Sequence, residues 1–300
     1  MAFEYKTFLS NDGAEIKYID EGSGPIVLYI YGIGSSIQSS SVFIDTMKQH
    51  CRFIIFDQRG FGITKGQGEV GIHQSARDAY ALINHLNLED VILFGYSMGA
   101  AVVFSYIRQF GCAHLKKILI GDMSPKLINE DGWNLGLYQG HYTRKMYEDD
   151  LVLIRNDYKR FALILSEQLL KKNTAENPRD FSGTAEEIRN RILAGNFNPL
   201  SVTALFAGLV DLTPEHSEIN YYYWETMAGA DFRDIFPTIT VPCGLLYADP
   251  GSGYQPATAE YMKSQIQAPV SMFPIENSSH MASGDNPKQF IGNILQFVTQ

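Results

Sequence analysis

The stretch that decides the fold is Val91-Ile-Leu-Phe-Gly95-Tyr-Ser97-Met-Gly99-Ala-Ala-Val-Val103. Its first four residues are apolar without polar alternation, which predicts a strand buried on both faces, as in a parallel sheet covered by helices. The small residues after Ser97 begin a segment with helical spacing over residues 98–109. Gly95-Tyr-Ser97-Met-Gly99 therefore matches a G-x-S-x-G turn, in which the chain reverses sharply at the serine and the glycines let strand and helix approach.

Apolar runs of the same kind lie on both sides of this stretch. They cover residues 25–31, 52–57, 117–121, 241–247 and 270–273. Two further segments, 74–86 and 286–299, carry apolar side chains at helical spacing. Strand and helix patterns that alternate in this way predict an α/β fold, with a mostly parallel central sheet flanked by helices.

The pattern changes between residues 125 and 236. No buried strand is indicated there, and segments 150–168 and 184–194 have apolar residues at helical spacing. We therefore predict a core formed by residues 1–124 and 237–300, into which a helical cap of residues 125–236 is inserted.

The composition excludes several classes of function. A net charge of −9 without any Lys/Arg-rich block argues against binding to nucleic acid or to an anionic membrane surface. No apolar run is long enough to span a membrane and the N-terminus lacks signal-peptide features, so the sequence predicts a cytoplasmic protein. The three cysteines are widely spaced, and no Cys/His spacing resembles a metal site.

Ser97 at the sharp turn is the candidate nucleophile. A serine hydroxyl is a weak nucleophile unless a base removes its proton, and the base is expected to be a histidine. His280 is the best placed of the seven histidines, because Asn277-Ser-Ser-His280 follows the last strand-like run. The backbone N–H groups of Met98 and of Ile33, in the glycine-rich loop after the first long strand, are candidates for an oxyanion hole.

These motifs together resemble the α/β-hydrolase superfamily over most of the chain. Asp57-Gln-Arg59-Gly60-Phe-Gly62 is similar to a structural turn of that family, and the segment ending in His280 is similar to the one that carries its catalytic histidine. The chain departs from the family at Tyr31, where the family usually has a histidine before the oxyanion loop. The resemblance implies a serine hydrolase of esters, lactones, amides or thioesters that needs no metal or cofactor.

The acid that orients the histidine has more than one candidate. In the family it usually follows the strand after the cap, and the matching stretch here is Ala248–Pro256. Asp249 lies two residues early in that stretch and precedes a proline. Other family members place the acid after the strand that follows the nucleophile helix, which corresponds to Asp122. We favour Asp122, with Asp249 as the alternative and Glu276 as a third choice.

The predicted cap is rich in aromatic residues, which are expected to line an apolar cavity above Ser97. The candidate substrate-binding rings are Trp133, Tyr138, Tyr142, Phe206 and Trp224. We therefore predict hydrolysis of a small, fairly apolar ester or lactone through an acyl-enzyme on Ser97. The alternatives are carbon–carbon hydrolysis, perhydrolysis or dioxygenation without a cofactor on the same residues, or a ligand receptor with slow turnover.

Overall fold

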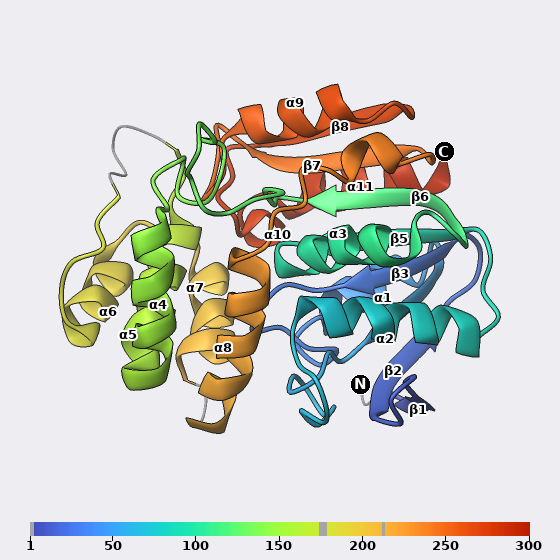
Figure 1. The fold of residues 1–300 in the computed structure, drawn as a ribbon, viewed down its shortest axis with the longest axis horizontal. Helices are drawn as coiled ribbons and strands as arrows, with labels where there is room; N and C mark the ends of the chain where they lie inside the picture. The colour runs from blue at the N-terminus through green and yellow to red at the C-terminus, as the bar shows by residue number, and fades with distance from the viewer. Residues whose placement is uncertain (1–2, 174–178, 212–213) are drawn as a thin grey trace.

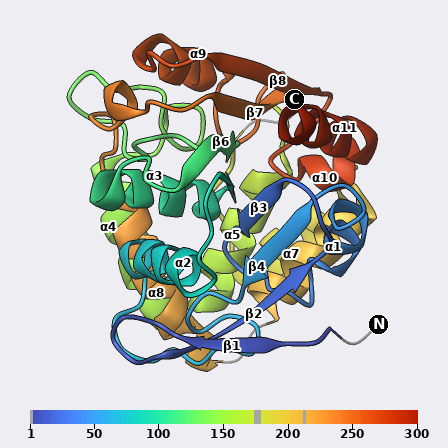
Figure 2. The same ribbon diagram turned by 90° about the vertical axis from the view of Figure 1, so that its right-hand side faces the viewer.

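The fold is built around one β-sheet, which a computed structural model describes for residues 3–173, 179–211 and 214–300. Within these residues the sheet has eight strands in the order β1-β2-β4-β3-β5-β6-β7-β8 (Figure 2). The strands are β1 (Lys6–Leu9), β2 (Glu15–Glu21), β3 (Ile26–Ile30), β4 (Arg52–Phe56), β5 (Val91–Tyr96), β6 (Leu115–Gly121), β7 (Cys243–Asp249) and β8 (Val270–Glu276). Strands β3 to β8 pair in parallel, which confirms the predicted mostly parallel sheet.

The apolar runs in the sequence correspond to the six parallel strands, whereas the pattern did not reveal β1 and β2. These two strands form an antiparallel edge, and β2 pairs with β4. In β2, Ile16 and Tyr18 are buried while Glu15 and Lys17 are more exposed. A half-buried edge strand alternates in this way, so it lacks the continuous apolar run that marks a strand covered on both faces.

Helices cover both faces of the sheet (Figure 2). On one face lie α2 (Ile72–His85), α3 (Met98–Phe110) and α9 (Pro256–Gln265), and on the other lie α1 (Ser41–Met47) and α11 (Pro287–Thr299). Residues Met98 to Ile107 of α3 are all buried, because this helix packs against the sheet and α2, and its Phe104 contacts Phe232 of the inserted segment. None of the helices in the described ranges combines the length and the apolar character that a membrane crossing needs.

The segment between β6 and β7 is helical and lies at the carboxyl ends of the parallel strands (Figure 1). Its described elements are α4 (Arg144–Asn156), α5 (Tyr158–Leu170), α6 (Ala185–Ala194), α7 (Pro199–Leu205), the π-helix η1 (Phe206–Val210), α8 (Pro214–Ala228) and the short 3-10 helix η2 (Phe236–Thr238). The pattern over 150–168 belongs to two helices, since the chain breaks at Asp157, whose side chain caps α5. Residues 1–2 of the predicted core and 174–178 and 212–213 of the predicted cap lie outside the described residues.

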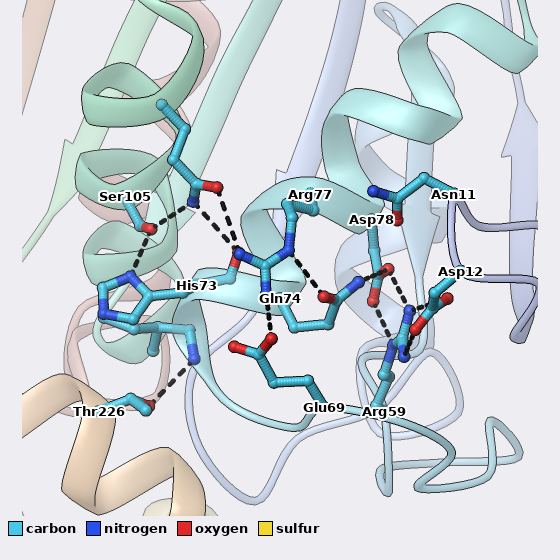
Figure 3. A network of polar contacts seen from close by, with 12 residues as sticks. Asn11, Asp12, Arg59, Glu69, His73, Gln74, Arg77, Asp78, Ser105 and Thr226 are labelled. Carbon is cyan, nitrogen blue, oxygen red and sulfur yellow. Dashed lines mark hydrogen bonds and ion pairs between the residues drawn. The ribbon is translucent and has the colours of Figure 1, made fainter.

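The helical insertion is tied to the core through α8. The hydroxyl of Tyr223 donates to the carbonyl of Arg59 at 3.2 Å and lies 3.0 Å from the hydroxyl of Ser75 on α2. One turn further along, the Thr226 hydroxyl accepts the N–H of Ile72 at 3.2 Å (Figure 3). These contacts hold α8 against α2, so the position of the insertion on the core is fixed.

The Asp57–Gly62 turn is held by a buried ion-pair network (Figure 3). The guanidinium of Arg59 is fully buried and forms paired hydrogen bonds with Asp78, at 2.8 and 2.9 Å, and with Asp12, at 2.6 and 2.8 Å. Hydrogen bonds from Ser10 and Gln74 reach the same Asp78 carboxylate. The turn therefore has a structural role, since removal of one partner would leave an uncompensated buried charge.

Candidate active site

Ser97 lies between β5 and α3 in a strained conformation. Its φ of 56° and ψ of −126° are rarely adopted by residues other than glycine, and such strain is common at functional sites. A Cβ atom on Gly95 would collide with the carbonyl of Gly99, and one on Gly99 would collide with the carbonyl of Ile30. Both glycines are therefore required for the close approach of strand and helix that holds the serine in place.

Ser97, His280 and Asp122 form a continuous hydrogen-bonded chain. The Nε2 atom of His280 lies 2.8 Å from the Ser97 hydroxyl, and its Nδ1 atom lies 2.7 Å from Oδ2 of Asp122. The three residues follow β5, β8 and β6, so parallel strands bring residues far apart in the sequence to one edge of the sheet. His280 and Asp122 are 3% and 5% exposed, which keeps the contact between them away from water.

The two other candidate acids lie apart from this chain. Asp249 and Glu276 are both exposed at the ends of β7 and β8. Asp249 contributes its backbone carbonyl, which accepts the N–H of Ser278. Among the described carboxylates, it is that of Asp122 that lies within hydrogen-bond distance of Nδ1 of His280.

Ser252 also contacts Asp122, a contact that the sequence analysis did not predict. Its hydroxyl donates to Oδ2 of Asp122 at 2.6 Å, and the side chain is fully buried. The residue belongs to the loop after β7, the stretch that the family resemblance marks as the usual place for the acid. A serine in a glycine-rich turn carries no pattern that distinguishes it from an ordinary turn residue.

The two candidate oxyanion donors lie in different elements beside Ser97. Met98 is the first residue of α3, so its N–H has no acceptor within the helix. Ile33 lies in the loop after β3, next to Gly32, where an added Cβ atom would come within 3.0 Å of the Ser97 Cβ. No acceptor for either N–H is found in the described part of the chain.

Tyr31 takes over the support of the loop that carries Ile33. Its hydroxyl donates to Asp57 at 3.3 Å and accepts the N–H of Gln58 at 2.8 Å, while the Gln58 side chain donates to the Tyr31 carbonyl. Asp57 also accepts the N–H of Ile37, further along the same loop. Burial raises the pKa of the Tyr31 hydroxyl well above its usual range, so it stays a proton donor to Asp57.

A cavity of about 600 Å³ opens onto Ser97 and His280. Its aromatic wall comes from the core and consists of Tyr29, Phe43, Phe61, Tyr96 and Phe290. The insertion contributes mainly small and aliphatic residues from α5, α7, η1 and α8, namely Leu169, Leu200, Thr203, Ala204, Leu205, Ala207, Gly208, Leu209 and His216. In the described part of the lining, no lysine, arginine, aspartate or glutamate is present.

The five rings predicted to bind substrate do not line this cavity. Tyr138, Tyr142 and Trp224 form an edge-to-face cluster inside the insertion, where the Trp224 indole N–H donates to the Tyr142 hydroxyl. Trp133 packs against Tyr261 of α9. The prediction was wrong because an all-helical unit needs an apolar core of its own, and large rings satisfy that need first.

The remaining predicted ring, Phe206, is also turned away from the cavity. It begins the π-helix η1, is 7% exposed and packs beneath the guanidinium of Arg189 on α6. Its neighbours Leu205 and Ala207 line the cavity instead. A one-residue difference in helical phase decides which side chain faces the cavity, and composition does not determine that phase.

Comparison with known proteins agrees with this architecture. A family model described as "alpha/beta hydrolase fold" matches residues 25–139. The chain has the α/β-hydrolase fold. An esterase from Exiguobacterium antarcticum superposes with a TM-score of 0.77 over 100% of both chains at 20% identity. The same arrangement of sheet and helices therefore extends over the whole chain.

Two further comparisons show that the proteins to which this chain is similar differ in activity. The enol-lactonase from Burkholderia xenovorans LB400 has a TM-score of 0.72 at 16% identity, covering 98% of this chain and 100% of the other. In sequence, a non-heme haloperoxidase from Rhodococcus erythropolis is 32% identical over 139 residues. That match spans 44% of this chain and about half of the relative, 50% of its length.

Proposed function

We propose that this α/β hydrolase cleaves small, neutral esters or lactones through an acyl-enzyme on Ser97. The observation that carries the proposal is the position of His280, which bridges the Ser97 hydroxyl at 2.8 Å and Asp122 at 2.7 Å. A base within this distance of a serine, itself oriented by a buried carboxylate, is the arrangement that activates a serine nucleophile. The names of the similar esterase and enol-lactonase support the same class of bond.

In the proposed reaction, Ser97 attacks the substrate carbonyl while Nε2 of His280 takes the hydroxyl proton. Asp122 holds the Nδ1–H of His280 and stabilises the imidazolium. The N–H groups of Met98 and Ile33 donate to the oxyanion of the tetrahedral intermediate. His280 then protonates the leaving alcohol, and the acyl-enzyme forms. Water, deprotonated by His280, attacks the acyl group, which leaves as the carboxylic acid and restores the serine.

The cavity lining favours a substrate without charge. The lining combines aromatic and aliphatic side chains with serine and threonine hydroxyls. Among its described residues, histidine is the only type with an acidic or basic side chain. A carboxylate buried in such a cavity would lose its hydration without gaining a cationic partner. We therefore expect p-nitrophenyl butyrate to be cleaved much faster than the mono-p-nitrophenyl ester of succinate.

A designed cation tests the same argument. Thr203 lines the cavity from α7 and is exposed, so a longer side chain has room there. Thr203→Lys is expected to raise the rate on the succinate half-ester and to leave the rate on the butyrate ester within a few-fold. If wild type prefers the charged ester, the proposed substrate class is wrong.

Perhydrolysis is a second candidate, supported by the haloperoxidase name of the Rhodococcus erythropolis relative. Hydrogen peroxide would replace water in attack on the acyl-enzyme, so that Ser97 is released and the acyl group leaves as a peracid. The same histidine would take the proton from the peroxide. Peracid formed from acetate and hydrogen peroxide, measured by bromide oxidation, separates this reaction from simple ester hydrolysis.

The decisive experiment removes the nucleophile. Ser97→Ala is expected to lower kcat/KM on p-nitrophenyl esters by several orders of magnitude while the protein stays folded. The matched control is Ser105→Ala, since Ser105 is a buried serine on α3, the helix that follows Ser97, and its hydroxyl contacts His73. A fluorophosphonate probe should label wild type at Ser97. A folded Ser97→Ala variant with most of its activity would refute the mechanism, and labelling without turnover would favour a receptor.

A further inference from the structure

The loop after β7 delivers a buried hydroxyl to the carboxylate of Asp122. The Ser252 hydroxyl lies 2.6 Å from Oδ2, the same oxygen that lies 2.7 Å from Nδ1 of His280. The Ser252 oxygen accepts the N–H of Tyr254 at 3.2 Å, so its own proton is free to point at the carboxylate. An ionised carboxylate can only accept, which sets the direction of the bond.

The two oxygens of Asp122 are held unequally. Oδ1 receives the N–H of Ala248 at 3.4 Å, a long contact, whereas Oδ2 receives both short bonds. Bonds to a charged acceptor are the strong ones, so Ser252 and His280 together determine the rotation of the carboxylate. Without the serine, the carboxylate would keep one strong bond and could turn about it.

The inserted segment holds Ser252 in place. The backbone carbonyl of Ser252 accepts hydrogen bonds from the side chains of Gln139, at 2.5 Å, and of Arg179. Gln139 also donates to the carbonyl of Tyr254 at 2.9 Å, and Arg179 donates to the carbonyl of Gln168 at 2.7 Å. Both donors come from the chain between β6 and β7, so the insertion holds the loop after β7 in position.

We propose that Ser252 is a positioning residue that keeps Asp122 aimed at His280, and this inference rests on the proposed function. The hydroxyl occupies the loop where the family usually has its acid, and it acts on the acid supplied by β6. Oδ2 of Asp122 accepts hydrogen bonds from both Ser252 and His280. The bond from Ser252 weakens the attraction of the carboxylate for the Nδ1 proton of His280. Ser252 is not among the described residues that line the cavity, so its effect passes through Asp122.

The test compares Ser252→Ala with Ser124→Ala. Ser124 is a buried serine two residues from Asp122, and its hydroxyl donates to the carbonyl of Lys126 at 2.8 Å rather than to the acid. Loss of the Ser252 hydroxyl is expected to lower kcat on p-nitrophenyl butyrate about tenfold, with KM within about twofold. The acidic limb of the kcat/KM profile should move to higher pH, because the carboxylate then attracts the His280 proton more strongly.

A second variant and a spectroscopic signal keep the test independent of folding and of activity. Ser252→Cys keeps the size of the side chain with a weaker donor, so its kcat and pH profile should fall between wild type and Ser252→Ala. The downfield proton resonance of Nδ1 of His280 should shift in both Ser252 variants and stay in place in Ser124→Ala. This signal is read whether or not an ester is hydrolysed.

The outcomes separate the two claims. If wild type is active and labels at Ser97, but folded Ser252→Ala keeps its kcat, pH profile and proton resonance, the positioning role is wrong and the proposed function stands. If wild type hydrolyses no ester while the resonance shifts in the Ser252 variants, the contact is real and the proposed function is wrong. If Ser124→Ala changed kcat, the pH profile and the resonance as much as Ser252→Ala does, the effect of Ser252 would be a general structural one and the positioning role would be wrong.

Discussion

Replacement of Gly208 by alanine is expected to lower kcat at least about tenfold by displacing one oxyanion donor. Gly208 lies in the π-helix η1, which lines the cavity, and its backbone packs against Gly34 in the loop after β3. A Cβ atom on either glycine would come closer than 3.0 Å to the carbonyl oxygen of the other. Neither carbonyl is a flexible side-chain end, so the two backbones must move apart.

The size of the effect follows from this geometry. A Cβ atom on Gly208 would lie 2.3 Å from the Gly34 carbonyl oxygen, whereas ordinary contact begins at 3.4 Å. The gap must therefore open by about 1.1 Å, or by roughly half of that for each backbone if both move. Ile33, whose N–H is the proposed donor, is the residue before Gly34 and moves with it. A displacement of about 1 Å costs roughly 10²-fold in rate, and about half of that shift corresponds to roughly tenfold, or about 1.4 kcal/mol in the barrier.

The assay is steady-state hydrolysis of p-nitrophenyl butyrate beside thermal unfolding. Gly208→Ala should reduce kcat with little change in KM, since the lost interaction is made in the transition state. Gly292→Ala is the matched control, because Gly292 is exposed on α11 and an added Cβ atom meets nothing within 4 Å. A folded Gly208→Ala protein with wild-type kcat would refute the link between η1 and the oxyanion loop.

Three further predictions concern the acid, the rings and the cap. Asp122→Asn should lower kcat/KM by up to about 10⁴-fold, and Asp249→Asn should change it little; the reverse order would move the acid to β7. Trp224→Ala should lower the free energy of unfolding by about 3–5 kcal/mol without changing acyl-chain preference, whereas Phe43→Ala, in the cavity wall, should shift preference to longer chains. Burial raises the pKa of Asp150, beneath the rings of the insertion, to about 7 from 3.8, so the folded protein keeps a proton that the unfolded chain releases between these values. Stability should therefore fall as the pH rises from about 4 to about 7, and Asp150→Asn should flatten that part of the Tm profile; an unchanged slope would show that Asp150 does not carry it.

The six parallel strands could be predicted from the sequence because burial on both faces produces a continuous apolar run in each of them. Runs such as residues 91–94 and 117–121 are continuous in the sequence, and each reports its own environment. Ser97 could also be predicted from a local pattern, because the strained turn requires Gly95 and Gly99 close to it in the sequence. The edge strands β1 and β2 were not predicted, because half-buried strands lack a continuous apolar run.

Residues that meet across the fold were determined by tertiary structure alone. Asp122 follows β6 and Asp249 ends β7, so the local pattern favoured Asp122 without excluding Asp249. The sheet order and the direction of each side chain distinguish them. Ser252 reaches Asp122 across 130 residues of sequence. A hydrogen bond of this kind depends on positions to within a few tenths of an ångström, and no local pattern of residue types encodes that.

The same distinction explains the aromatic residues of the insertion. Their number correctly indicated a buried apolar environment, which composition determines because large rings avoid water. Whether a ring such as Trp224 enters the core of the insertion or the cavity depends on helix phase and on the angle at which α8 packs against α4. The hydrophobic effect is non-directional. It therefore determines that a ring is buried, whereas the packing of the helices determines which residues bury it.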